Sequence, residues 1–215
     1  MSTLKNSAGK KKYYKQDFKN IFTIDYLEHN KIQAQELCTV AIYQDKEYLI
    51  NPKLNDRLEE HYGELIAQAY TAPMHITWVN KMVEYGVFAE EKIVRGHMVC
   101  EYTGIVCADK DDAENLYLWD YPTVTYETVI TSSGKTRRKK QKYCIDAQVA
   151  GSYARFINHT TKKYQNVGIQ IVPAQGFWHV IYVAQRDILP GQQLLTHYGI
   201  SYWRDRQIVP VALIP

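Results

Sequence analysis

The sequence predicts a mostly β fold of the α+β class that follows a smaller helical region. From residue 75 onward, short runs rich in β-branched and aromatic residues are separated by Gly, Pro and Asp, a pattern typical of strands joined by turns. These runs cover residues 75–79, 98–102, 126–130, 168–172 and 178–184. No long helical run separates them, so we expect several small, mostly antiparallel sheets and no parallel βαβ sheet.

The first 74 residues have a different character. Residues 1–20 are polar and rich in lysine, and we expect them to form a disordered basic tail. Residues 21–74 form the expected helical region, in which apolar residues recur at spacings of three and four: Leu54, Leu58, Tyr62, Leu65 and Ala69. Pro52 and Pro73 bound this run. The helical region is expected to cap the β domain; a docking surface for substrate, or a homodimer contact, is the alternative.

Composition narrows the class of protein. The 215 residues are enough for one domain with an appendage or for two small ones, and the hydrophobic content of 46% is ample for a core. The four cysteines form no C-x-x-C pair, so we expect no metal site and a reducing compartment. No apolar run has the ~20 residues of a membrane span, and the N-terminus lacks the apolar core of a Sec signal peptide.

Two segments in the second half of the chain form a recognisable signature. Residues 155–160 read Arg-Phe-Ile-Asn-His-Thr, and residues 197–199 (His-Tyr-Gly) follow about 40 residues later. Three further segments agree in order: 85–89 (Tyr-Gly-Val-Phe-Ala), 101–104 (Glu-Tyr-Thr-Gly) and 143–146 (Tyr-Cys-Ile-Asp). At these residues the chain resembles the SET-domain family, the protein lysine methyltransferases that use S-adenosylmethionine (SAM). The resemblance covers roughly residues 76–203.

This resemblance implies an architecture. The fold would be the SET-domain β-clip with a pseudo-knot, in which Asn158 and His159 lie where the chain threads under a loop. The SET domain is expected over residues 75–203. Residues 204–215 are expected to form a short tail that closes over the cofactor without zinc.

The resemblance also implies where SAM binds. The backbone from Tyr85 to Phe88 would contact the amino-acid end of SAM, although the family usually has Gly-x-Gly where this chain has Glu84-Tyr85-Gly86. Asn158 would bind the SAM amino group through its side chain, and His159 would offer backbone groups to the adenine. The predicted cofactor-binding residues are Tyr85, Gly86, Val87, Phe88, Arg155, Phe156, Asn158, His159 and Trp203.

Methyl transfer to lysine places demands on the residues around the amine. The amine has a solution pKa near ~10.4 and must lose its proton before it attacks the sulfonium methyl group. An apolar aromatic channel favours the neutral amine by desolvation, and alignment supplies much of the rate. The predicted catalytic residues are Tyr198, whose hydroxyl would orient the amine or the methyl group, and Tyr102, whose ring would wall the lysine channel.

Four further residues are expected along the substrate channel: Tyr143, Ile169, Thr196 and Tyr202. Thr196 stands two residues before Tyr198, at the position where the resemblance places a switch of methylation degree. Because Thr196 and Ile169 are small or aliphatic, they leave room for a methylated lysine. The expectation is therefore di- or trimethylation.

Six basic residues crowd one predicted hairpin tip over residues 132–142: Lys135, Arg137, Arg138, Lys139, Lys140 and Lys142. A solvated surface is the simplest interpretation. Contact with DNA phosphates, a nuclear localisation signal and a self-methylated lysine cluster are the alternatives.

The resemblance predicts a SAM-dependent protein-lysine N-methyltransferase with a basic protein, most favourably a histone tail, as substrate. The compact build is similar to that of SET proteins from chlamydia-type intracellular bacteria and large DNA viruses. In that setting the protein would be a bacterial effector that enters the host cell and its nucleus; otherwise it would stay in the bacterial cytoplasm. A bacterial histone-like protein as substrate, and an inactive SET-like binding module, are the alternative hypotheses.

Overall fold

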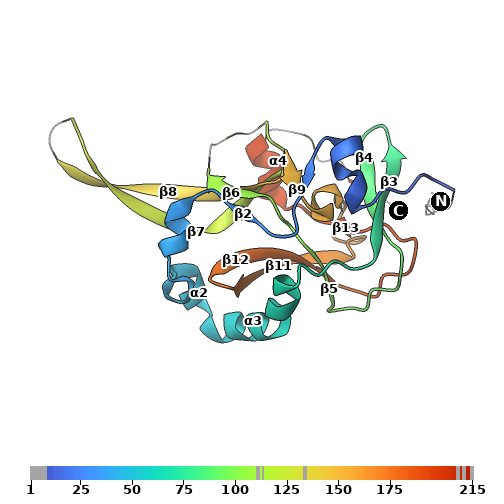
Figure 1. Cartoon of the computed structure of the whole chain (residues 1–215), viewed down its shortest axis with the longest axis horizontal. Helices are drawn as coiled ribbons and strands as arrows, with labels where there is room; N and C mark the ends of the chain where they lie inside the picture. Colours follow the sequence, from blue (N-terminus) through green and yellow to red (C-terminus); the bar gives the residue numbers. More distant parts are fainter. Residues whose placement is uncertain are drawn as a thin grey trace.

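Small β-sheets surround one main hydrophobic core (Figure 1). The computed structural model describes residues 9–109, 112, 114–132, 135–206, 209, 212 and 213. The helical segments, where η marks a 3-10 helix, are η1 (Lys15–Asp17), α1 (Phe18–Phe22), η2 (Gln35–Thr39), η3 (Ile42–Gln44), α2 (Lys46–Ile50), α3 (Pro52–Ala67), η4 (Tyr153–Phe156) and α4 (Ile200–Arg206). The strands are β1 (Asp25–Tyr26), β2 (Lys31–Ile32), β3 (Met74–Asn80), β4 (Glu84–Ala89), β5 (Met98–Glu101), β6 (Ile105–Ala108), β7 (Leu118–Ile130), β8 (Thr136–Asp146), β9 (Ala150–Gly151), β10 (Asn158–His159), β11 (Val167–Ala174), β12 (Phe177–Ala184) and β13 (Leu195–Thr196).

The five predicted strand segments are confirmed as parts of β3, β5, β7, β11 and β12. The pairing is mostly antiparallel: β11, β12 and β5 form one sheet, and β6, β8 and β7 are neighbours in another. Segment 126–130 is only the outer end of β7, which forms a long hairpin with β8 that extends away from the rest of the molecule (Figure 1). The basic residues predicted at a hairpin tip lie mainly along strand β8, with Lys135 just before it.

The N-terminal segment is more ordered than its composition suggested. Phe18 is fully buried and makes edge-to-face contacts with the rings of Tyr153 and Phe156. Tyr13 pairs with Ile76 as an isolated bridge, through hydrogen bonds of 2.8 and 2.9 Å in the two directions. The predicted disordered tail is therefore wrong for residues 9–20, because buried aromatic side chains offset the entropy of ordering the chain. Residues 1–8 lie outside the described residues.

The segment predicted as helical also contributes strands. β1 pairs in parallel with β9, and β2 pairs in parallel with β6. Helix α3 begins at Pro52, where the side chain of Asn51 accepts a hydrogen bond from the Leu54 amide, as expected for an N-cap. Leu54 is itself 41% exposed, and Ala69 lies beyond the end of the helix with a φ of 51°.

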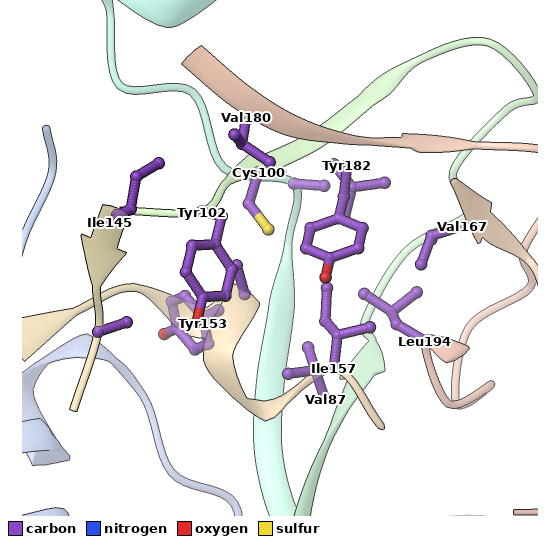
Figure 2. Close-up of a cluster of buried hydrophobic side chains, with 14 of the residues drawn as sticks. Val87, Cys100, Tyr102, Ile145, Tyr153, Ile157, Val167, Val180, Tyr182 and Leu194 are labelled. Atoms are coloured by element: carbon purple, nitrogen blue, oxygen red, sulfur yellow. The ribbon is translucent and has the colours of Figure 1, made fainter. Parts of the chain in front are cut away.

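The buried face of α3 covers the three-stranded sheet. Tyr62 and Ile66 share a hydrophobic cluster with Met98, Val172 and Ile181 from β5, β11 and β12. The main core lies between the sheets and includes Tyr102, Tyr182 and their aliphatic neighbours; Figure 2 shows part of it. The helical region thus packs as a cap on the β domain.

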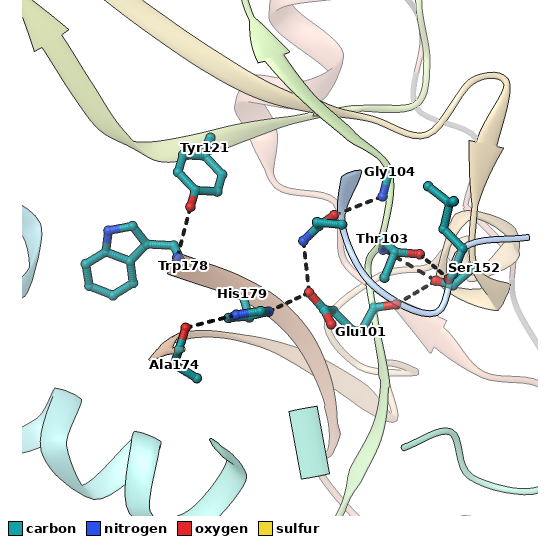
Figure 3. Close-up of polar contacts among 10 residues, drawn as sticks. Glu101, Thr103, Gly104, Tyr121, Ser152, Ala174, Trp178 and His179 are labelled. Atoms are coloured by element: carbon teal, nitrogen blue, oxygen red, sulfur yellow. Dashed lines mark hydrogen bonds and ion pairs between the residues drawn. The ribbon is translucent and has the colours of Figure 1, made fainter. Parts of the chain in front are cut away.

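A buried polar network ties the N-terminal segment to the sheets (Figure 3). One carboxylate oxygen of Glu101 accepts from Asn30 Nδ2 at 2.9 Å and lies 2.8 Å from His179 Nδ1. Asn30 Oδ1 in turn accepts from the Gly104 amide at 2.9 Å. Buried polar groups are costly unless they are paired, so this network holds the segment before β2 against β5 and β12.

The chain crosses itself next to β10. β10 pairs in parallel with β13, and the Thr160 amide continues this contact by donating to Thr196 O at 2.8 Å. On another side, the Leu213 amide donates to His159 O at 3.1 Å. Residues 158–160 therefore run between β13 and the C-terminal segment, in the pseudo-knot arrangement that was predicted.

Candidate active site

One cavity of about 500 Å³ lies beside this crossing. Its wall comes from the β3–β4 turn, the start of β7, η4 with β10, and the segment that contains α4. The lining residues include Glu84, Tyr85, Tyr102, Tyr117, Trp119, Tyr182, Tyr198, Tyr202 and Trp203, together with the run 154–159. The cavity therefore brings together residues that lie more than 100 positions apart in the chain.

Asn158 joins β10 to the β3–β4 turn. Its side-chain Nδ2 donates to Tyr85 O at 2.8 Å. Gly86 lies directly beneath, and a Cβ placed on it would be 3.0 Å from Asn158 Nδ2 and 2.4 Å from Gln193 Nε2. The start of β4 and the Asn-His pair thus meet, and the side chains of Asn158, Gln193 and Val79 leave no space for a Cβ at residue 86.

Val87 and Phe88 do not line the cavity in the described part of the chain. Val87 is fully buried in the core, and the Phe88 ring stacks on His75 with centroids 5.9 Å apart. The Val87 carbonyl accepts from the Leu194 amide at 2.8 Å. Both faces of β4 are covered, so these two predicted cofactor-binding residues build the core behind the cavity.

The Tyr198 hydroxyl is held at the cavity wall by the backbone. It donates to Ile157 O at 2.8 Å, while the Tyr198 amide donates to His159 Nδ1 at 3.1 Å. Burial raises the pKa of Tyr198 well above its ordinary value, with Tyr202 and Tyr102 adding to the effect. The hydroxyl is therefore protonated and uncharged at neutral pH.

Two buried tyrosines, Tyr102 and Tyr182, share this wall with Tyr198. The Tyr102 hydroxyl donates to Tyr117 O at 2.7 Å. Burial raises the pKa of Tyr102 and of Tyr182 as well. Tyr182 was missed in the sequence because no motif marks it; its place follows from β12 pairing with β5, opposite Cys100. Three neutral phenols thus face one cavity.

An aromatic cluster closes the C-terminal side of the cavity. Trp203 stacks on Tyr198 at 5.8 Å and 16°, and its ring meets His159 edge-on at 4.8 Å. Burial, with His197 nearby, lowers the pKa of His159 to about 4, so this imidazole is neutral at pH 7. Trp203 Nε1 is buried and has no hydrogen-bond partner among the described residues. An indole N–H in this position is a donor available to a bound molecule.

Arg155 and Phe156 also lie at the cavity. The Arg155 Nε donates to Ala147 O at 2.8 Å, and its guanidinium carbon lies 3.9 Å from the centre of the Tyr117 ring. Stacking on an aromatic face is a common arrangement for arginine. Arg155 therefore fixes Tyr117 and the start of β7 against η4.

Of the four residues predicted along the substrate channel, one lies at the cavity among the described residues. Tyr202 lines the cavity, and its hydroxyl donates to Leu116 O at 3.2 Å. The other three predicted residues are not among the described residues of the wall. Tyr143 is buried at the root of the β7–β8 hairpin, where its hydroxyl lies 2.6 Å from Thr125 Oγ1. Ile169 packs against the core opposite Tyr182, and Thr196 is fully buried on β13.

The comparison with known proteins agrees with this geometry. The family model described as the SET domain matches residues 84–199, more than half of the chain. The chain belongs to the SET-domain family. Within the described residues, this SET domain has no cluster of His, Cys, Asp and Glu able to hold a metal ion, and none of its helices is long and apolar enough to span a membrane.

Several relatives share this SET domain. The chain is 31% identical over 144 residues to the N-lysine methyltransferase KMT5A-A of Danio rerio, covering 66% of this chain and 39% of that protein. It is 37% identical over 117 residues to KMT5A-B of Xenopus laevis, covering 53% of this chain and 32% of that protein. The chain therefore spans well under half of these relatives. The structure of ATXR5 in complex with a histone H3.1 has the same fold, with a TM-score of 0.58 and 16% identity over 85% of this chain and 84% of that one.

Proposed function

We propose that this SET domain is a protein-lysine N-methyltransferase that uses SAM. The observation that carries the proposal is the wall of three neutral tyrosines, the buried Tyr102 and Tyr182 and the half-buried Tyr198, beside the junction of Asn158 with the start of β4. This wall desolvates whatever enters the cavity and so favours the uncharged lysine amine, the form that can attack a methyl group. The KMT5A relatives, named as N-lysine methyltransferases, support the same reaction.

The residues around the cavity fit SAM. Trp203 Nε1 is a buried donor without a partner among the described residues. Aromatic faces from Tyr85 and Phe156 suit a sulfonium cation. Asn158, His159 and the turn at Tyr85 would hold the cofactor. When bound, SAM supplies an electrophilic methyl group on a positively charged sulfur.

Tyr198 is the residue we assign to alignment of the amine. Its hydroxyl is already held by Ile157 O, so the ring has one orientation and loses little freedom when the substrate binds. The protonated phenol uses its hydrogen to donate and retains oxygen lone pairs that accept from an amine N–H. It orients the amine without itself carrying charge.

The substrate we propose is a lysine in a basic protein, with a histone tail favoured. Related SET proteins of Drosophila carry the name histone-lysine N-methyltransferase Set8, which supports this choice. The expectation of di- or trimethylation loses its basis, because Ile169 and Thr196 are absent from the described wall and Tyr182 brings a further hydroxyl there. The mass of the methylated product gives the number of methyl groups added to the lysine.

We propose, for the setting, a compact SET effector of the chlamydial or viral kind that acts on host chromatin. A substrate in the bacterial cytoplasm, such as a histone-like protein, is the competing case. The choice rests on which basic protein accepts the methyl group. Parallel reactions with nucleosomes and with a bacterial histone-like protein separate the two.

The first experiment measures transfer of labelled methyl groups from SAM to core histones and nucleosomes. Wild-type protein is compared with Tyr198→Phe, and with Tyr43→Phe as a matched control because Tyr43 is 47% exposed and is not among the described residues that line the cavity. We expect label on one histone, loss of at least tenfold with Tyr198→Phe and no change with Tyr43→Phe. SAM binding without methyl transfer to any protein would show that the chain is a binding module and not an enzyme.

A further inference from the structure

The β7–β8 hairpin forms a two-stranded ribbon that stands away from the sheets (Figure 1). Beyond an irregularity between Tyr121 and Thr125, residues 125–130 pair continuously with residues 136–141. At about 3.4 Å per residue, this regular part is roughly 17 Å long. Nothing in the proposed methyl transfer requires it.

The register sorts the ribbon into two unlike faces. Residues directly opposite each other share a face, so Tyr126 with Lys140 and Thr128 with Arg138 lie on one side. Alternation along β8 adds Lys142 to this side. We call this set the cationic face: Tyr126, Thr128, Arg138, Lys140 and Lys142. The opposite face pairs Glu127 with Lys139 and Val129 with Arg137.

The charges of the ribbon are unbalanced. Residues 121–142 contain six lysines and arginines but a single carboxylate, Glu127, in a chain whose total charge is only +3. The remainder of the chain is therefore net negative. Within the described part of the structure, none of the six side chains forms an ion pair. A surface that serves only solubility carries charges of both signs, whereas the cationic face carries only positive charges.

Exposed apolar groups stand among these cations. Tyr126 is 54% exposed, and the guanidinium of Arg138 lies 4.9 Å from the centre of its ring. Ile130, on the same side of the outer end, is 77% exposed. Cations interleaved with an aromatic ring are suited to a partner that presents both negative charge and flat apolar surface.

We propose that the cationic face binds double-stranded nucleic acid through its phosphates, without reading sequence. A two-stranded β-ribbon is one of the two elements that fit the major groove of B-DNA. Lysine and arginine side chains on such a ribbon replace condensed counterions, which supplies binding energy independent of base sequence. Arg138, with its planar fork, matches a phosphate bidentately. An acidic protein surface is the competing partner.

The ribbon begins at the active-site wall. Leu118 and Trp119, the first residues of β7, line the cavity. A nucleic acid held on the cationic face would therefore keep the cavity close to proteins bound on the same nucleic acid. The inference stands apart from the proposed methyl transfer, since binding needs neither SAM nor a lysine substrate.

The test measures fluorescence anisotropy of a labelled 24-base-pair duplex with the full chain at increasing salt. Arg138→Gln/Lys140→Gln removes two charges from the cationic face, and Arg137→Gln/Lys139→Gln removes two from the opposite face. We expect the first variant to lower the slope of log K against log salt by roughly 2, at about 0.9 per phosphate contact. We expect the second to change the slope by less than half as much.

Equal losses in the two variants would overturn the assignment to one face. No salt-dependent binding by the wild type would overturn the nucleic-acid site altogether. If polyglutamate at equal charge concentration displaces the duplex, the partner of the cationic face is an acidic protein and not a nucleic acid. Tyr198→Phe is expected to keep full duplex binding, and Arg138→Gln/Lys140→Gln to keep methyl transfer to a free peptide, so the two proposals fail independently.

Discussion

Replacing Gly86 by alanine tests the tightest point of the candidate active site. The backbone φ of Gly86 lies outside the left-handed region, so the substitution adds no torsional strain. The added Cβ would instead lie 2.4 Å from Gln193 Nε2, 2.9 Å from Val79 Cγ2 and 3.0 Å from Asn158 Nδ2. The effect of Gly86→Ala is therefore purely steric.

The neighbours of Gly86 differ in how far they can yield. The Gln193 amide is the end of a flexible side chain and can turn away. Val79 is β-branched and stiff at χ1, and Asn158 is held by its bond to Tyr85 O. Overpacking of this kind costs about 1–3 kcal/mol, and loss of the Asn158 bond adds about 1 kcal/mol. For a chain of 215 residues, the sum lowers Tm by roughly 5–15 °C.

The assay combines thermal unfolding with titration of SAM by calorimetry. We expect Gly86→Ala to lower Tm and to weaken SAM binding by about tenfold or more, since ~1.4 kcal/mol corresponds to a factor of ten. Gly63→Ala in α3 is the matched control, because its new Cβ meets only Glu59 Cγ at 3.6 Å. That change should raise stability by about 0.5–1 kcal/mol. Wild-type stability and SAM affinity in Gly86→Ala would refute the close packing of the turn against Asn158.

Two further predictions concern the aromatic surroundings of the cavity. Phe22→Ala should weaken SAM binding several-fold, because the Phe22 ring packs against Tyr85 and Phe156 with centroids 5.0 and 4.9 Å away; calorimetry measures the Kd. Stability should fall as pH drops from about 6.5 toward 4, because the folded state holds His159 neutral with a pKa near 4, while the unfolded chain binds a proton at its ordinary pKa. Tm measured against pH should fall less steeply in His159→Asn.

Each of these predictions has its own control. Ile21→Ala removes the exposed neighbour of Phe22 and should leave SAM affinity unchanged; equal losses in both variants would show that Phe22 acts only through overall stability. For the pH profile, His75→Asn is measured beside His159→Asn, because burial lowers the pKa of His75 too. If His159→Asn keeps the full wild-type slope, protonation of His159 does not contribute to acid unfolding.

The course of the N-terminal segment shows where composition misled. Lysines dominate residues 1–20, which suggested a tail, yet Phe18 among them is fully buried. Burial of this one ring between Tyr153 and Phe156 contributes more to ordering the N-terminal segment than the neighbouring charges do, because those charges remain at the surface. Nothing in the local pattern distinguishes such a ring from an exposed one, because two of its partners, Tyr153 and Phe156, lie more than 130 residues away and only Phe22 and Tyr26 are near in sequence.

The sequence by itself determined the family, the positions of five strands, and the convergence of Tyr85, Asn158 and Tyr198 on one site, because motifs and local patterns name these residues directly. Only the tertiary structure decided which of the 18 tyrosines face the cavity. Tyr182 reaches it and Tyr143 does not, since each ring follows the face that strand pairing gives it. Side chains alternate along a strand, and a shift of one residue in register reverses the face. That register is set by contacts distant in sequence, such as β12 with β5.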